Sequence, residues 1–209
     1  MNKIWNISIV IIILAIGVHA TPKKGTMKDV RDGKTYKTIK IGKQMWMAEN
    51  LNFITKESFC YENKSANCKK YGRLYDWYDA ARVCPFGWHL PSKAEFERLF
   101  EYIDGQDVAG AILKSENGWN RCEVGTDGEE RSCTDDGNGS DFYGFSALPG
   151  GRRISRGDYH SEGIAAFFWT STKYNASNAY SISLTYYTVN GIIIDNNRNA
   201  AFSVRCLKN

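Results

Sequence analysis

The stretch from Tyr71 to Ile103 carries the strongest local constraints on the fold. Ser92 and Glu95 precede an apolar run, so the Ser hydroxyl can accept a first-turn N–H while the Glu carboxylate reaches back, which is a capping box. The apolar residues that follow recur at the spacing of one helix face: Phe96, Leu99, Phe100 and Ile103. We therefore expect a helix here, ended by Gly105.

Two further helices are predicted in the first half of the chain. Residues 75–83 repeat apolar side chains at helical spacing and stop at Cys84 and Pro85. Residues 107–115 can form a third short helix whose inward side chains would be Val108, Ala111 and Ile112. The proline-containing connection over residues 85–91 has to be ordered, and its Phe86 and Trp88 need apolar surroundings.

The rest of the chain favours strands and loops. Residues 30–51 alternate apolar and polar side chains on both sides of Gly42, which predicts a β-hairpin. Residues 52–70 and 116–141 are polar and are expected to be loops. From Phe142 onward, short β-prone runs alternate with Gly, Asn and Asp. We predict an α+β domain with a mainly antiparallel sheet and two or three short helices in its first half.

The N-terminus indicates export. Lys3 precedes a short apolar run that ends at Ala20, where a signal peptidase would cut, so residues 1–20 are predicted to be a secretory signal peptide. Residues 21–29 are expected to be a linker and residues 30–209 the domain. The alternative is an uncleaved N-terminal anchor. After cleavage no membrane span is expected, and the mild net charge of +4 does not indicate nucleic acid as a partner.

The six cysteines suit an exported chain, because disulfides persist in oxidising compartments. Cys60 with Cys68 and Cys122 with Cys133 would each close a short polar loop. That pairing leaves Cys84, at the end of a predicted helix, for Cys206 near the C-terminus. Zinc ligation is the rival use of cysteine, but the sequence contains no C-x2-C pair.

No constellation of residues in the sequence favours catalysis. Glu95 and Glu97 lie two apart on a predicted helix and so diverge. Asp158, His160 and Ser161 form a hydrophilic turn with no further indication of a catalytic triad. Phosphate loops and dinucleotide fingerprints are also missing from the sequence.

An acidic loop and a set of aromatic rings are the candidate binding sites. The loop offers oxygen ligands that suit calcium, although its spacing differs from an EF-hand and a solvated loop is the alternative: Asp135, Asp136, Asn138 and Asp141. No cofactor is expected apart from calcium as this alternative to a solvated loop. Aromatic rings near loops or strand ends can stack on sugars or anchor a protein, although each could instead belong to the core: Trp119, Trp169, Tyr174, Tyr180, Tyr186 and Tyr187.

Several segments together resemble a known bacterial family. In chain order they are DGKTYKTIKIGKQMWMAENLNF, YGRLYDWYDAARVCPFGWHLPSKAEFERL, DFYGFSALPGGRR, FFWTSTKYNASNAYSISL and FSVRCLK. They resemble the Fibrobacter succinogenes major paralogous domain family, from about Val30 to Lys208. The resemblance implies a secreted or surface-displayed bacterial domain.

A weaker resemblance concerns the fold. The segments WYDAARVC and GWHLPSKAEFERL are similar to signatures of the formylglycine-generating sulfatase-modifying enzymes, which have a variant of the C-type lectin fold. In lectin-like domains a Cys near the end of an early helix bridges to a Cys in the last strand, which fits Cys84 with Cys206. Those enzymes also use two redox-active cysteines in their C-terminal part, whereas here Cys206 is the only Cys beyond Cys133, so their activity does not carry over.

We therefore expect a secreted or cell-surface, non-catalytic binding module for polysaccharide or for a surface protein. The alternatives are a glycan-active or sulfatase-modifying-like enzyme, or a structural envelope component without a ligand.

Overall fold

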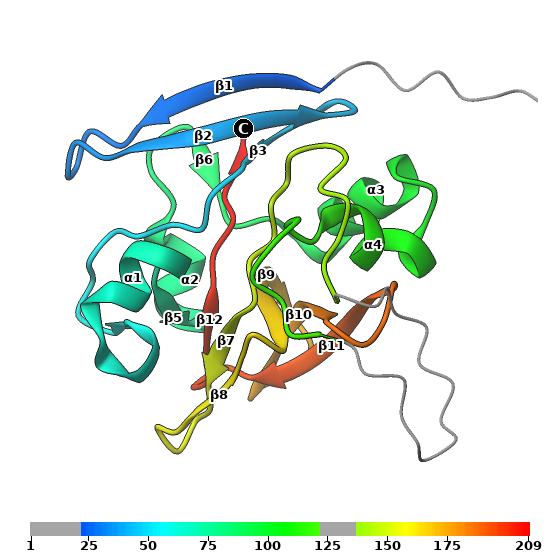
Figure 1. Ribbon diagram of the computed structural model, residues 1–209. Helices are drawn as coiled ribbons and strands as arrows, with labels where there is room; N and C mark the ends of the chain where they lie inside the picture. The colour runs from blue at the N-terminus through cyan, green and yellow to red at the C-terminus, as the bar shows by residue number, and fades with distance from the viewer. Residues whose placement is uncertain (1–21, 122–136) are drawn as a thin grey trace, which may run out of the picture.

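The structure is a computed structural model that describes residues 22–121 and 137–209 (Figure 1). The strands are β1 (Lys23–Lys28), β2 (Thr35–Ile41), β3 (Gln44–Met47), β4 (Ser58–Phe59), β5 (Leu74–Asp76), β6 (Trp88–His89), β7 (Gly150–Arg153), β8 (Tyr159–Glu162), β9 (Ala165–Lys173), β10 (Asn178–Thr185), β11 (Gly191–Asn197), β12 (Ala201–Ser203) and β13 (Leu207–Lys208). The α-helices are α1 (Ser65–Tyr71), α2 (Trp77–Val83), α3 (Lys93–Tyr102) and α4 (Ala109–Leu113), and the 3₁₀ helices are η1 (Tyr61–Asn63) and η2 (Gln106–Val108).

The strands form two sheets. The larger has the order β11-β10-β9-β7-β12-β5-β4, with β8 beside β7, and the smaller has the order β1-β2-β3-β13-β6. Among the described strands, β9 runs parallel to β7 and to β12, and the other strand pairs are antiparallel. The predicted α+β class and mainly antiparallel sheet are confirmed.

Helices cover both faces of the larger sheet. Successive side chains of a strand point to opposite faces, so β9 contributes Phe168 to the core beneath α3 and α4 and Trp169 to the core beneath α2. The Trp169 ring stacks on Phe202 with centroids 4.2 Å apart, and its indole N–H donates to the Tyr75 carbonyl. This strand therefore holds the two cores together.

The predicted capping box is confirmed. The Ser92 hydroxyl accepts from the Glu95 N–H at 3.2 Å, and the Glu95 carboxylate accepts from the Ser92 N–H at 2.7 Å. The helix predicted over residues 75–83 begins later, at Trp77, because residues 74–76 pair with β12 as strand β5.

Helix α4 turns a different face inward from the one predicted. The structure buries Ala109, Gly110 and Leu113 and leaves the three expected residues, Val108, Ala111 and Ile112, half-buried. Gly110 determines this orientation, because a Cβ at this position would lie 2.6 Å from the Asn190 carbonyl oxygen. Only a residue without a side chain permits this close approach.

Three features depart from the sequence predictions. Strand β1 lies where a linker was expected, since its backbone pairs along its whole length with β2 although its side chains are mostly exposed. Helix α1 and η1 occupy part of the loop predicted over residues 52–70, which makes four short α-helices in the described chain instead of two or three. Phe86 has no apolar surroundings and is fully exposed.

Two of the predicted disulfides are present, Cys60–Cys68 and Cys84–Cys206. Cys122 and Cys133 lie outside the described residues, as do residues 1–20 of the expected signal peptide. In the part of the chain that the structure describes, no helix has the length and apolarity needed to cross a membrane.

The C-terminal segment connects the two sheets. It runs from β12 in the larger sheet to β13 in the smaller one, and Figure 1 shows it in red passing between them. Its connecting residues Val204, Arg205 and Cys206 are fully buried. A buried arginine therefore lies where the sheets meet, directly behind the cleft described next.

Candidate functional site

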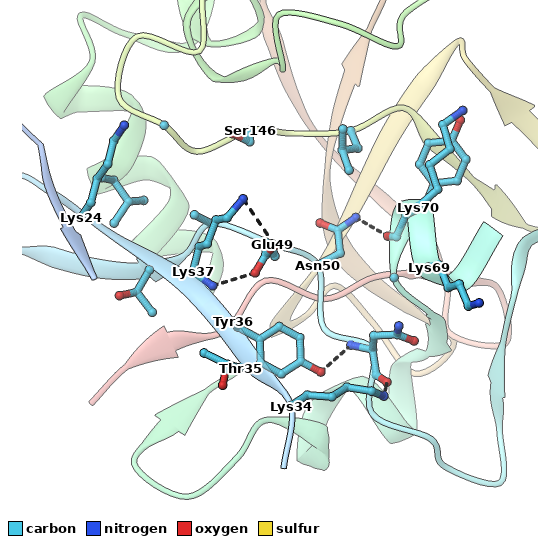
Figure 2. A pocket seen from close by; sticks show the side chains of 18 of the residues that line it. Lys24, Lys34, Thr35, Tyr36, Lys37, Glu49, Asn50, Lys69, Lys70 and Ser146 are labelled. Carbon is cyan, nitrogen blue, oxygen red and sulfur yellow. Dashed lines mark hydrogen bonds and ion pairs between the residues drawn. The ribbon is translucent and has the colours of Figure 1, made fainter. Parts of the chain in front are cut away.

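A cleft of about 660 Å³ opens between the smaller sheet, helix α1 and the loop 141–148. We call it the lysine cleft, because five lysines line it: Lys24, Lys34, Lys37, Lys69 and Lys70. Figure 2 shows Lys24 and Lys37 along the β1–β2 side, Lys69 and Lys70 on the α1 side, and Asn50 between the two groups. Lysines from β1, from the beginning of β2 and from α1 thus line one cleft.

The folding of each element explains why these lysines face the cleft. Strand β1 pairs antiparallel with β2, which places Lys24 opposite Ile39, while Lys34 directly precedes β2 and Lys37 is its third residue. Helix α1 is fixed at Cys68 by the disulfide to Cys60, so the two exposed lysines that follow project at the cleft margin. Lys70 also lies over the Tyr71 ring, 4.5 Å from its centroid.

Only part of this positive charge is neutralised inside the described structure. Lys34 pairs with Asp32 at 3.1 Å, and the Lys37 ammonium lies 3.9 Å from Glu49. Among the described residues, no carboxylate lies within 4 Å of the ammonium groups of Lys24, Lys69 or Lys70. The cleft is therefore electropositive.

The floor of the cleft is a hydrogen-bonded polar network. The Asn50 amide donates to the Tyr71 carbonyl at 2.8 Å, and its oxygen accepts from Arg205 Nε at 2.6 Å. Arg205 further donates to the carbonyls of Met47, Phe145 and Ser146. One side chain thus joins β3, the loop 141–148 and the residue at the floor of the cleft.

Burial lowers the pKa of Arg205 to about 9. The guanidinium is nevertheless charged at neutral pH, and the described partners of its N–H groups are uncharged oxygens. Its charge therefore adds to the positive potential behind the floor, where the surrounding protein screens it less than water would.

The two carboxylates that line the cleft already accept hydrogen bonds. Glu49 accepts from the Lys37 N–H at 2.7 Å. Asp141 accepts from the Ser146 N–H at 2.6 Å and from the Ser146 hydroxyl. Burial raises the pKa of Asp141, although these hydrogen bonds act in the opposite direction. Burial likewise raises the pKa of the Tyr36 phenol to about 12, so Tyr36 is neutral and accepts from the Asn52 N–H.

The structure separates the predicted aromatic residues into two groups. Trp169 is fully buried and Trp119 is 6% exposed, so both rings belong to the core and do not form the ligand surface expected of them. Each indole N–H donates to an acceptor inside the protein, so the polar group of each ring is also satisfied in the core. The position of these residues near strand ends or loops in the sequence did not indicate that the folded chain covers both rings.

The predicted tyrosines lie nearer to solvent. Tyr174 and Tyr187 are 53% and 41% exposed, whereas Tyr180 and Tyr186 are half-buried. Tyr186 and Tyr187 contact each other edge to face. None of them lines the lysine cleft.

Of the four residues predicted to bind calcium, the structure describes two, Asn138 and Asp141. Asp135 and Asp136 lie outside the described residues. Asn138 accepts from the Trp119 N–H, and Asp141 accepts from Ser146 as described above. Within the described residues there is no group of three or more His, Cys, Asp or Glu side chains that could hold a metal ion.

The sequence does not indicate the cleft residues as a site. Residues 21–29 and 52–70 are predicted to be a linker and a surface loop, although both segments are rich in lysine. That richness was the available indication, but only the pairing of β1 with β2 and the formation of α1 bring the lysines together.

Comparison with known proteins gives one match. A search of curated proteins found no similar protein, and a search of solved structures found no similar structure. The family model for the Fibrobacter succinogenes major domain matches residues 39–208, which include α1 and the loop 141–148 at the cleft as well as the buried Arg205, while Lys24, Lys34 and Lys37 precede the matched residues. The chain therefore belongs to the Fibrobacter succinogenes major domain family.

Proposed function

We propose that this domain is a non-catalytic binding module that acts outside the cell and holds an anionic polysaccharide in the lysine cleft. The observation that carries the proposal is that five lysines, from β1, from the beginning of β2 and from α1, line one cleft whose described lining includes only two carboxylates. A chain of acidic sugars would pass between the β1–β2 side and α1 and contact cations on both sides. Such ligands are attracted over a distance and oriented by the field of the cleft.

The hydrogen bonding of the cleft supports binding over catalysis. General acid–base chemistry needs a carboxylate or imidazole that can exchange a proton with a substrate. Glu49 and Asp141 instead hold the backbone N–H groups of Lys37 and Ser146, which gives them a structural role.

Action outside the cell is supported by the two disulfides, since such bonds persist in oxidising compartments. A lectin-like fold is also part of the proposal. Its support is the bridge from Cys84, directly after α2, to Cys206, directly before the last strand.

Titration calorimetry with polygalacturonate tests the proposed function, with neutral xylan as the control polymer. The double variant Lys69→Gln with Lys70→Gln should weaken polygalacturonate binding about 3- to 10-fold, because each exposed charge pair contributes roughly 0.3 to 0.7 kcal/mol. Binding should also weaken as salt is added.

The matched control removes two other exposed lysines of the smaller sheet, Lys40→Gln with Lys43→Gln. Neither lines the cleft, and the change in net charge is the same. Equal weakening by the two double variants would mean that net charge, and not the cleft, attracts the polymer. Equal affinity for xylan would refute the anionic ligand class.

A further inference from the structure

A second cationic surface, which shares no residue with the lysine cleft, surrounds Trp77 at the start of α2. Three segments meet there: the first turn of α2, the β9–β10 hairpin and the turn before β12. We call it the Trp77 patch and define it by Trp77, Tyr78, Lys173 and Arg198; the Trp77 ring itself is buried, whereas Tyr78 and Lys173 are exposed.

Two cations flank the Trp77 ring. The Arg198 guanidinium carbon lies 5.2 Å from the Trp77 ring centroid and 5.1 Å from that of Tyr78, and the Lys173 ammonium lies 5.7 Å from the Trp77 ring. These distances are within the range of cation–π attraction. The two rings contact each other edge to face at 5.9 Å.

Backbone hydrogen bonds fix this arrangement. The Trp77 indole N–H donates to the Thr170 carbonyl at 2.8 Å. The Arg198 backbone accepts from the Trp77 N–H and donates to the Ser177 carbonyl, each at 3.0 Å. The Trp77 ring and the backbone of Arg198 are thus held in place before any ligand arrives, which lowers the ordering cost of binding.

The charges of the patch are not neutralised by the described protein. No carboxylate among the described residues lies within 4 Å of the cationic groups of Arg198 or Lys173. Asp79 pairs with Arg82 at 2.6 Å, and Asp195 accepts from the Asn178 amide at 2.7 Å. In addition, the Arg198 Nε is buried without a hydrogen-bond acceptor in the described structure.

Flat aromatic surface is exposed beside these charges. Tyr78 is 47% exposed, although most aromatic rings among the described residues are buried. The half-exposed Tyr78 ring and the neighbouring Arg198 guanidinium therefore offer a ligand an apolar face and an anion contact at one place.

We propose that the Trp77 patch is a second binding site, one that takes a pyranose unit carrying a negative charge. The apolar face of the sugar would cover the exposed Tyr78 ring, and its carboxylate or sulfate would contact Arg198 and Lys173. This site stands independently of the lysine cleft. If both sites bind, one polymer chain or two neighbouring chains can engage the domain at two points, which raises avidity.

Backbone amide NMR during titration of the purified protein tests the second site. The probes are trigalacturonate, which carries carboxylates, a sulfated disaccharide, and neutral cellotriose. We expect shifts at residues 77–78, 173 and 198 with one or both anionic probes and no shifts there with cellotriose. The anionic probe that acts identifies the charged group, and equal shifts with cellotriose would refute a role for charge.

Arg198→Gln should weaken binding at the patch at least fivefold and leave any shifts at the lysine cleft unchanged. Arg156→Gln removes another exposed arginine, which is not in the patch, and should have no effect on it. A dispersed spectrum close to that of the unchanged protein verifies that each variant is folded.

The two proposals fail separately. If residues 69–70 shift and residues 77–78, 173 and 198 do not, the Trp77 patch is refuted while the lysine cleft stands. If only the patch residues shift, the lysine cleft is refuted and the second site stands.

Discussion

Arg205 connects the two sheets and the cleft through uncharged partners. Its guanidinium is fully buried and donates to three backbone carbonyls and to the Asn50 side chain. Because arginine presents its donors in a planar fork, it can hold several oxygens in a fixed arrangement that a lysine cannot reproduce. The position of the cleft floor therefore depends on this side chain.

We predict that Arg205→Leu lowers the free energy of unfolding by about 3 kcal/mol or more, because several buried acceptors lose their donor at once. Arg205→Lys should restore only part of this loss. Urea denaturation at pH 7 measures both values. A loss below about 1 kcal/mol for Arg205→Leu would show that water or neighbouring groups donate to these acceptors in place of the guanidinium.

The aromatic rings show why the burial of a single residue could not be predicted from the sequence. Trp169 and Tyr174 lie five positions apart on the same hairpin, and for both the sequence left a binding surface and the core as alternatives. The first is fully buried and the second is half exposed. Residue type does not distinguish them, since the difference comes from α2, which covers the sheet beside Trp169. For the same reason the contact between Tyr78 and Arg198, which are distant in sequence, could not be predicted.

At the scale of elements, helix α3 shows how local chemistry fixes a boundary. Its capping carboxylate, Glu95, also contacts His89, which in turn contacts Asn209 at the C-terminus. Arg98 lies 3.7 Å from the same carboxylate. Burial raises the pKa of Glu95, but hydrogen bonds from Ser92 and His89 outweigh it, so the pKa lies below its ordinary value.

A lowered carboxylate pKa stabilises the folded protein above the unfolded value of about 4.5, and the contribution is lost as the pH falls through the lower folded value. We predict that Glu95→Gln costs about 1 kcal/mol at pH 5 and that the difference from the unchanged protein narrows toward pH 3. Urea denaturation at each pH measures it. A difference that is constant from pH 5 to pH 3 would contradict ionisation of Glu95 as the cause.

Elements with strong local patterns were predictable from the sequence, and those that depend on distant partners were not. The hairpin of β2 and β3 and helix α3 carry apolar periodicity of their own. By contrast, β1 has mostly exposed side chains and exists through its pairing with β2. Helix α1 has seven residues, too few to be stable alone, and depends on its packing and on its disulfide. Both missed elements form walls of the lysine cleft, which is why the sequence did not indicate that site.

At the scale of the whole molecule, the two sheets are joined by the C-terminal segment, which carries Arg205 and Cys206 side by side. The Cys84–Cys206 bridge adds a covalent link between α2 and this segment. The cleft lies where the smaller sheet meets α1 and the loop 141–148, so its shape depends on how the sheets are held together. The long bridge should therefore govern global stability, and the Cys60–Cys68 bridge should govern the α1 wall.

The two bridges differ most in the length of chain that they close. Their cysteines are separated by 122 and 8 positions in the sequence. In the chain-entropy model, losing the long bridge costs about 5 kcal/mol and losing the short one about 2.5 kcal/mol. We predict this order for the pairs Cys84→Ala with Cys206→Ala and Cys60→Ala with Cys68→Ala, measured by urea denaturation.

The short-bridge variant should also lose affinity for polygalacturonate at a temperature where it is still folded, because α1 then no longer holds Lys69 and Lys70 at the cleft margin. Circular dichroism verifies folding at that temperature. Unchanged affinity would show that packing alone holds α1 in place. A larger stability loss for the short bridge than for the long one would show that loop length does not determine what each disulfide contributes to this fold.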